Sequence, residues 1–252
     1  FGAVICDPGR DEMVICCYPG HMTPGRFSNA LKHVWGKVKR HPTWTYSLAD
    51  GKWTPLPGKA AHFFPNAAAW DSDAKRIVGY GGRGIWELSG EPRIWKKLPG
   101  RSMFGWHNNM AYDSKKEAMV IFGTNKNSND IVVYNPTSKE HKKMPTEGKR
   151  PAEDQHNPMC FDTRAGATVI VVDRVEGDLK DRKAPRKGET WLYDLGADAW
   201  TQLPEATLPF GCGMNYNMEY DPNNGACLLV EQRRGKPTTV WALKVDRAKM
   251  GK

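Results

Sequence analysis

The stretch Tyr112-Asp113-Ser114, followed by Met119-Val120-Ile121, decides the fold because its pattern occurs five times in the chain. Each copy has an apolar or aromatic residue, then Asp, then a turn, then an apolar run. The other copies are Cys6-Asp7-Pro8 with Met13-Val14-Ile15, Trp70-Asp71-Ser72 with Ile77-Val78, Phe161-Asp162-Thr163 with Val169-Ile170-Val171, and Tyr220-Asp221-Pro222 with Cys227-Leu228-Leu229. Such an internal repeat predicts an architecture built from similar units.

Each copy continues with a second pair of signals, an aromatic-rich segment and then a short segment ending in Leu-Pro or Met-Pro. The aromatic-rich segments are residues 44–47, 85–88, 131–134, 191–194 and 240–243, and the Pro-ended segments are residues 53–57, 95–99, 141–145 and 200–204. The enrichment in β-branched and aromatic residues predicts four short antiparallel strands in each unit. The repeated Asp can accept hydrogen bonds from the backbone just after it, which favours a tight first turn.

The pattern resembles the kelch and galactose-oxidase-like β-propeller families. The resemblance rests on the aromatic-rich segments, on the Trp-x-x-Leu-Pro elements and on Gly81-Gly82 after Ile77-Val78; the repeated Asp residues are 64, 42, 49 and 59 positions apart, near the fifty of kelch units. It implies an all-β, kelch-type β-propeller with five four-stranded blades. We expect one domain over residues 1–252, with blades at about 1–57, 62–99, 106–145, 155–204 and 214–246.

The fifth unit lacks a Trp-x-x-Leu-Pro segment, since the chain continues after Val245 with Asp246-Arg247-Ala248-Lys249. We therefore expect the last blade to lack its outer strand. Three explanations stay open: a segment before Phe1 supplies the strand, the blade has three strands, or a partner chain donates the fourth.

The composition limits the partners. The formal charge is +9 and the pI about 9.2, which favours anionic partners or serves solubility alone. There is no basic helix or RNA-binding aromatic motif, so nucleic acid is not an expected partner. No apolar run is long enough for a membrane span. A start at Phe1 rather than Met suggests a removed signal peptide or a trimmed chain, and we expect a secreted or periplasmic protein.

Six cysteines are present, and none forms a CxxC pair, so a zinc ribbon is not expected. Cys6, Cys16, Cys160 and Cys227 fall inside apolar strand segments. They are expected to be buried thiols, with a disulfide as the alternative.

The turns of a four-stranded blade alternate between two faces, and one face is expected to carry long loops. These are residues 19–43, 100–106, 146–155, 174–188 and 205–214. Binding sites concentrate in long loops on a rigid scaffold, so we expect the functional face there.

The first residues of the innermost strands align at a fixed distance from the repeated Asp, at the mouth of the expected channel. They are Pro65-Asn66, His107-Asn108, His156-Asn157 and Asn215-Tyr216. The expected ligand-binding residues are Asn66, Arg83, Trp106, His107, Asn108, His156, Asn157 and Asn215. The alternative is a structural role, in which these groups bond to backbone and to channel water.

The leading functional hypothesis is a binding module that recognises an anionic or neutral glycan, or a protein partner, through the long-loop face. The rival is a carbohydrate-active lyase, hydrolase or oxidase with His107, His156 and Tyr216 as candidate acid/base groups. A third alternative is a structural subunit of a larger assembly. No cofactor is predicted, and no metal, because no carboxylate recurs beside the His-Asn pairs.

Overall fold

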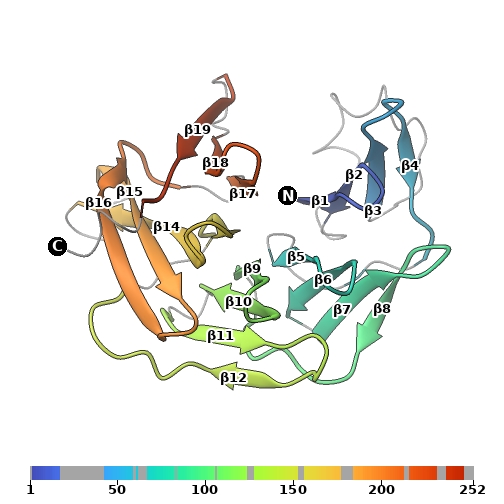
Figure 1. Ribbon diagram of the computed structural model, residues 1–252, viewed down its shortest axis with the longest axis horizontal. Coiled ribbons are helices and arrows are strands. Elements are labelled where there is room, and N and C mark those ends of the chain that lie inside the picture. The colour runs from blue at the N-terminus through green and yellow to red at the C-terminus, as the bar shows by residue number, and fades with distance from the viewer. Residues whose placement is uncertain are drawn as a thin grey trace. The chain divides into compact units, whose positions relative to one another are not determined.

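The computed structural model describes residues 2–17, 43–58, 61, 67–82, 84–105, 107–123, 128–152, 156–176, 184–212, 216–231 and 237–246. The fold is all-β, a five-bladed β-propeller, and the described residues contain no helix (Figure 1). Residue contacts divide the chain into two compact units, Phe1–Trp106 (unit 1) and His107–Lys252 (unit 2), and each is described by itself. The expectation of a single domain over residues 1–252 stays a prediction. Within the described ranges, no segment has the helical length and apolarity that a membrane crossing needs.

Unit 1 holds blades 1 and 2, each a four-stranded antiparallel sheet in chain order. Blade 1 is β1 (Gly2–Asp7), β2 (Glu12–Cys17), β3 (Thr43–Ser47) and β4 (Trp53–Pro55); blade 2 is β5 (Ala68–Asp71), β6 (Arg76–Gly81), β7 (Gly84–Ser89) and β8 (Ile94–Leu98). Apolar residues of both blades share one core cluster, in which Val14 and Ile77 are buried. The buried Arg93 joins the blades by pairing with Asp7 at 3.1 Å and with Glu12.

Unit 2 holds blades 3, 4 and 5. Blade 3 is β9 (Asn109–Asp113), β10 (Ala118–Phe122), β11 (Ile131–Tyr134) and β12 (His141–Lys143); blade 4 is β13 (Met159–Asp162), β14 (Ala167–Val175), β15 (Arg186–Asp194) and β16 (Ala199–Leu208). Blade 5 is β17 (Asn217–Asp221), β18 (Ala226–Glu231) and β19 (Thr239–Leu243), a three-stranded sheet in the described residues. One core cluster lies between blades 3 and 4, and another between blades 4 and 5.

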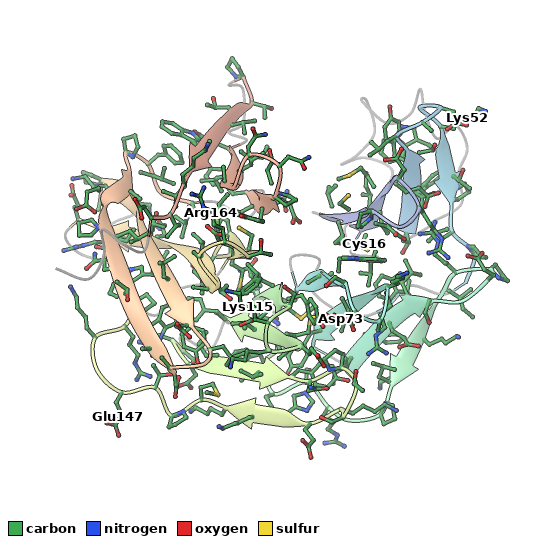
Figure 2. All side chains as sticks on the ribbon, viewed as in Figure 1. Cys16, Lys52, Asp73, Lys115, Glu147 and Arg164 are labelled. Carbon is green, nitrogen blue, oxygen red and sulfur yellow. The ribbon has the colours of Figure 1, made fainter. Side chains whose placement is uncertain are left out.

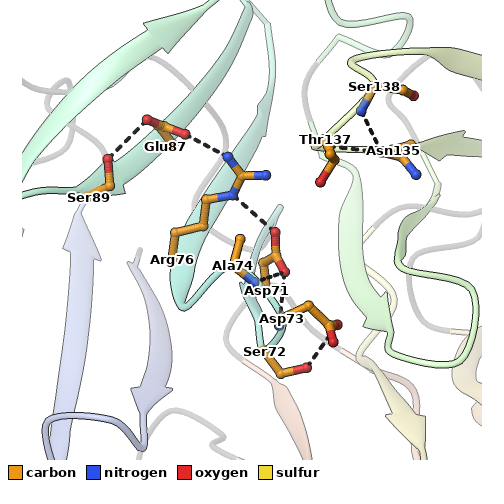
Figure 3. A network of polar contacts seen from close by, with 10 residues as sticks. All are labelled: Asp71, Ser72, Asp73, Ala74, Arg76, Glu87, Ser89, Asn135, Thr137 and Ser138. Atoms are coloured by element: carbon orange, nitrogen blue, oxygen red, sulfur yellow. Dashed lines mark hydrogen bonds and ion pairs between the residues drawn. The ribbon is translucent and has the colours of Figure 1, made fainter.

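The repeated Asp is the last residue of the first strand in every blade, and in four blades it forms the predicted turn. Asp113 Oδ1 accepts the backbone N–H groups of Lys115 and Lys116 at 2.9 and 3.1 Å. Asp71, Asp162 and Asp221 bind the two equivalent N–H groups in the same way (Figure 3, for Asp71). These bonds mimic a backbone turn and pin each hairpin.

A left-handed residue ends the first turn of every blade, four positions after the repeated Asp. The five residues are Asp11, Lys75, Glu117, Gly166 and Gly225, with φ between 50° and 66°. Basic side chains of one blade reach the glycine turn of the next: a Cβ on Gly166 would lie 2.2 Å from Lys115 Nζ, and one on Gly225 would lie 3.3 Å from Arg164 (labelled in Figure 2). Basic side chains therefore lie against these turns where neighbouring blades of unit 2 meet.

Two expected loops of blade 4 are partly strand. Residues 174–188 were expected to be a loop, yet β14 runs to Val175 and β15 begins at Arg186. Residues 205–214 were expected to be a loop as well, yet β16 runs to Leu208. Cross-strand ion pairs of Arg174 with Glu189 and of Lys187 with Glu176 (2.7 Å) lengthen this ladder, so charged residues that suggested a loop belong to a hairpin.

The cysteines agree with expectation except at one position. Cys16, Cys160 and Cys227 are buried, whereas Cys6 is exposed. The expectation that Cys6 is buried was wrong, because its side chain points to the exposed face of β1, away from the buried Ile5 and Asp7 on either side.

Candidate functional site

His107 and His156 come together at the entries of the inner strands of blades 3 and 4. His107 Nδ1 and His156 Nε2 lie 2.7 Å apart, so one ring donates a hydrogen to the other. The rings meet edge to face with centroids 4.4 Å apart. The backbone N–H of His156 donates to the backbone carbonyl oxygen of His107 at 3.2 Å. Alignment of the chain's own repeats predicted that both residues lie at the starts of the inner strands. The structure adds their direct contact.

Both histidines have a left-handed backbone, with φ of 68° at His107 and 63° at His156. A residue with a Cβ pays about 1–2 kcal/mol for this conformation, and such strain gathers at functional sites. Two strained histidines at matching positions of neighbouring blades therefore mark a candidate site.

Asn108 and Asn157, which follow the histidines, are fully buried at 0 % exposure. Neither amide atom of either side chain finds a hydrogen-bond partner among the described residues, and the same holds for Asn109 Nδ2. A buried amide without a partner costs about 1–3 kcal/mol. The asparagines of the two His-Asn pairs thus have buried hydrogen-bonding groups that no described residue satisfies.

The imidazoles are held in the neutral form. Burial lowers the pKa of His107, and burial together with the neighbouring His107 lowers the pKa of His156 to about 4. At neutral pH each ring therefore has one donor and one acceptor nitrogen. A neutral imidazole pair beside two amides can exchange hydrogen bonds with hydroxyl and amide groups.

Tyr216 does not join the histidines in a polar site. It is buried in the core cluster between blades 4 and 5, and its ring meets Phe210 at 6.1 Å. Its role as an acid/base group stays a prediction that the geometry does not favour. The other expected ligand-binding residues, Asn66, Arg83, Trp106 and Asn215, lie outside the described residues.

Sequence reasoning missed a groove between blades 4 and 5. It has a volume of about 800 Å³ and lies between β16 and β19, with Leu203, Leu229 and Trp241 in its walls. The signal for it was the absent Trp-x-x-Leu-Pro segment of the fifth unit, whose side chains would occupy the equivalent place.

No group of three or more His, Cys, Asp or Glu side chains with metal-binding geometry occurs within the ranges that the structure describes. His107 and His156 stand as a pair of imidazoles whose facing nitrogens bond to each other.

The chain resembles several solved structures in fold. TolB from Acinetobacter baumannii matches at a TM-score of 0.58 and 12% identity, over 96% of this chain and 51% of the TolB chain. YjhT matches at a TM-score of 0.62 and 8% identity, over 93% of this chain and 79% of that chain. A chain of the nidogen/laminin complex matches at 0.50 and 12% identity, over 75% and 66%.

This chain spans about half the length of the TolB chain. No protein-family model and no curated protein matches the sequence. The similarity therefore concerns the propeller fold alone, and the kelch and galactose-oxidase-like resemblance stays at the level of the repeat pattern.

Proposed function

We propose that the protein is a binding module that recognises a neutral carbohydrate through the two His-Asn pairs of blades 3 and 4. The observation that carries the proposal is the set of enclosed Asn108 and Asn157 amides without partners in the described residues. Sugar hydroxyls both donate and accept hydrogen bonds, so they suit amides and neutral imidazoles equally well.

The lowered pKa of His156 favours binding over acid catalysis. A general acid works best with a pKa near the working pH, whereas the pKa of His156 is lowered to about 4. His107 is half-buried, while Asn108 and Asn157 have no exposure. We infer that the ligand makes its first contact at His107 and reaches the amides as that ring moves aside.

Carbohydrate binding is tested with a panel of neutral and uronate-bearing oligosaccharides, followed by calorimetric titration of any ligand found. The wild type is expected to bind a neutral member, and Asn157→Leu to weaken that binding about tenfold or more. His107→Asn is expected to weaken it too while keeping the left-handed backbone, which Asn tolerates.

Thr168→Val is the matched control. Thr168 in β14 is fully buried, and its hydroxyl also lacks a hydrogen-bond partner within the described residues, but it is not part of a His-Asn pair. Its replacement is expected to leave carbohydrate affinity unchanged. Equal affinities of the wild type and Asn157→Leu, or sugar turnover that depends on His156, would each reject the proposal.

The expected secreted or periplasmic location belongs to the same proposal, since such a module meets glycans outside the cytoplasm. Fractionation of the producing cells checks it, with recovery in the cytosolic fraction as the contrary result.

A further inference from the structure

Blades 1 to 4 show how a fourth strand completes the sheet of a blade. In register, the third strand faces the fourth through the pairs Tyr46↔Trp53, Leu88↔Trp95, Tyr134↔His141 and Tyr193↔Trp200. Three of these are aromatic pairs with ring centroids 4.7 to 4.9 Å apart. An aliphatic residue and then Pro follow each aromatic residue of the fourth strand at a spacing of three and four positions, as in Trp200-Thr201-Gln202-Leu203-Pro204.

Blade 5 has the same third strand but no strand beyond it in the described residues. Leu243 pairs with Cys227 where Tyr193 pairs with Thr168, so Leu243 takes the place of Tyr193. Trp241 then corresponds to Trp191. In blade 4 the outer edge of β15 pairs with β16. The outer edge of β19 (Figure 1) therefore presents backbone N–H and C=O groups in the same arrangement as that edge of β15.

The difference in exposure of these two tryptophans shows what the fourth strand contributes. Trp191 is 3% exposed and meets Trp200 of β16 edge to face at 6.3 Å. Trp241 is 37% exposed. Both belong to unit 2 and point toward the preceding blade, but Trp241 contacts Phe210 and donates to Glu231 where Trp191 packs on the fourth strand.

The groove of about 800 Å³ lies where the aromatic residue of a fourth strand would enter. It is continuous with the interface between blades 4 and 5, because Met218, Cys227 and Leu229 belong both to the groove wall and to that core cluster. In the preceding interface the same place is filled by Trp200, whose ring lies 5.4 Å from that of Phe122.

We propose that an extended segment of another polypeptide adds to β19 as the fourth strand of blade 5. The segment has the pattern aromatic-x-x-aliphatic-Pro, with the aromatic residue opposite Leu243 and its ring in the groove between blades 4 and 5. Backbone pairing supplies affinity and the ring supplies specificity, as in other cases of strand addition. This inference is independent of the carbohydrate site.

The test uses the full chain and a synthetic peptide with the sequence of residues 198–205, Asp-Ala-Trp-Thr-Gln-Leu-Pro-Glu. Binding is followed by fluorescence anisotropy, and backbone amide exchange is measured residue by residue by NMR. The peptide is expected to bind and to slow exchange in β19. The Trp200→Ala version of the peptide is expected to bind about tenfold more weakly or worse.

Two protein variants separate the groove from the rest of the strand. Trp241→Ala removes a groove wall and is expected to weaken peptide binding, whereas Val240→Thr on the opposite face of β19 is expected to leave it unchanged. Three results would overturn the proposal: equal binding of both peptides, protection without peptide of the β19 amides that point away from β18, or protection that appears only as the chain self-associates.

Discussion

At matched positions in blades 3 and 4, His107 and His156 combine a left-handed backbone with a ring-to-ring hydrogen bond of 2.7 Å. The left-handed conformation is strained, and burial lowers the pKa of both rings. The adjoining Asn108 and Asn157 amides add a further cost where the described chain offers them no partner. Unfavourable terms concentrated on four residues favour a functional explanation for them.

Titration of His156 makes stability depend on pH. Above pH 6.5 the ring is neutral in both states; as the pH falls from 6.5 toward about 4, the unfolded chain binds a proton that the folded chain excludes. Stability therefore falls in that window, by about 2 kcal/mol at pH 5. Urea unfolding at pH 7 and pH 5 measures this loss, and His156→Asn is expected to reduce it by that amount. An equal loss in wild type and variant would contradict the buried neutral ring.

At the scale of the element, the Asp turn recurs in four of the five blades. Asp113 binds two backbone N–H groups, and Asn135 does the same work in the turn after β11, with both bonds at 2.8 Å. What the turn needs at this position is thus a side-chain oxygen, which Asp and Asn both provide.

The last residue of the turn offers a stabilising substitution. Glu117 has φ of 50°, and Gly166 occupies the equivalent position in blade 4. Glu117→Gly is expected to raise the free energy of unfolding by about 0.5–1 kcal/mol, since relief of the left-handed strain exceeds the entropy that glycine adds to the unfolded chain. Lys116→Gly, one residue earlier in the same turn, is the control and is expected to destabilise. A loss of stability in Glu117→Gly by urea unfolding would be the contrary result.

The strands were predictable because their signals are local. The repeated Asp ends β1, β5, β9, β13 and β17, and the aromatic-rich segments lie in β3, β7, β11, β15 and β19, as predicted. The extension of blade 4 was not predictable, since its charged residues look like a loop until Arg174 pairs with Glu189 across the ladder. Pairing between strands decides such segments, and composition alone does not contain it.

At the scale of the whole molecule, the repeat spacing places the two His-Asn pairs at equivalent positions of neighbouring blades. It does not determine whether the two histidines are in contact. Contact between His107 and His156 depends on how blade 4 packs on blade 3, which a repeat spacing does not encode. The burial of Tyr216 follows the same logic: it aligns with Asn108 and Asn157, and all three are buried, with 5% exposure at Tyr216. A tyrosine at that level enters the core between blades 4 and 5 and adds an apolar surface to it.

If the buried Asn108 and Asn157 amides serve a ligand rather than the fold, their removal does not destabilise the protein. The free energy of unfolding of Asn108→Leu and Asn157→Leu, measured without ligand, tests it most directly, because leucine has a similar shape and no polar atoms. Both variants are expected to be as stable as the wild type or more stable, since an unpaired amide is removed. A loss of about 2 kcal/mol or more in either variant would show that the amides are hydrogen-bonded parts of the scaffold.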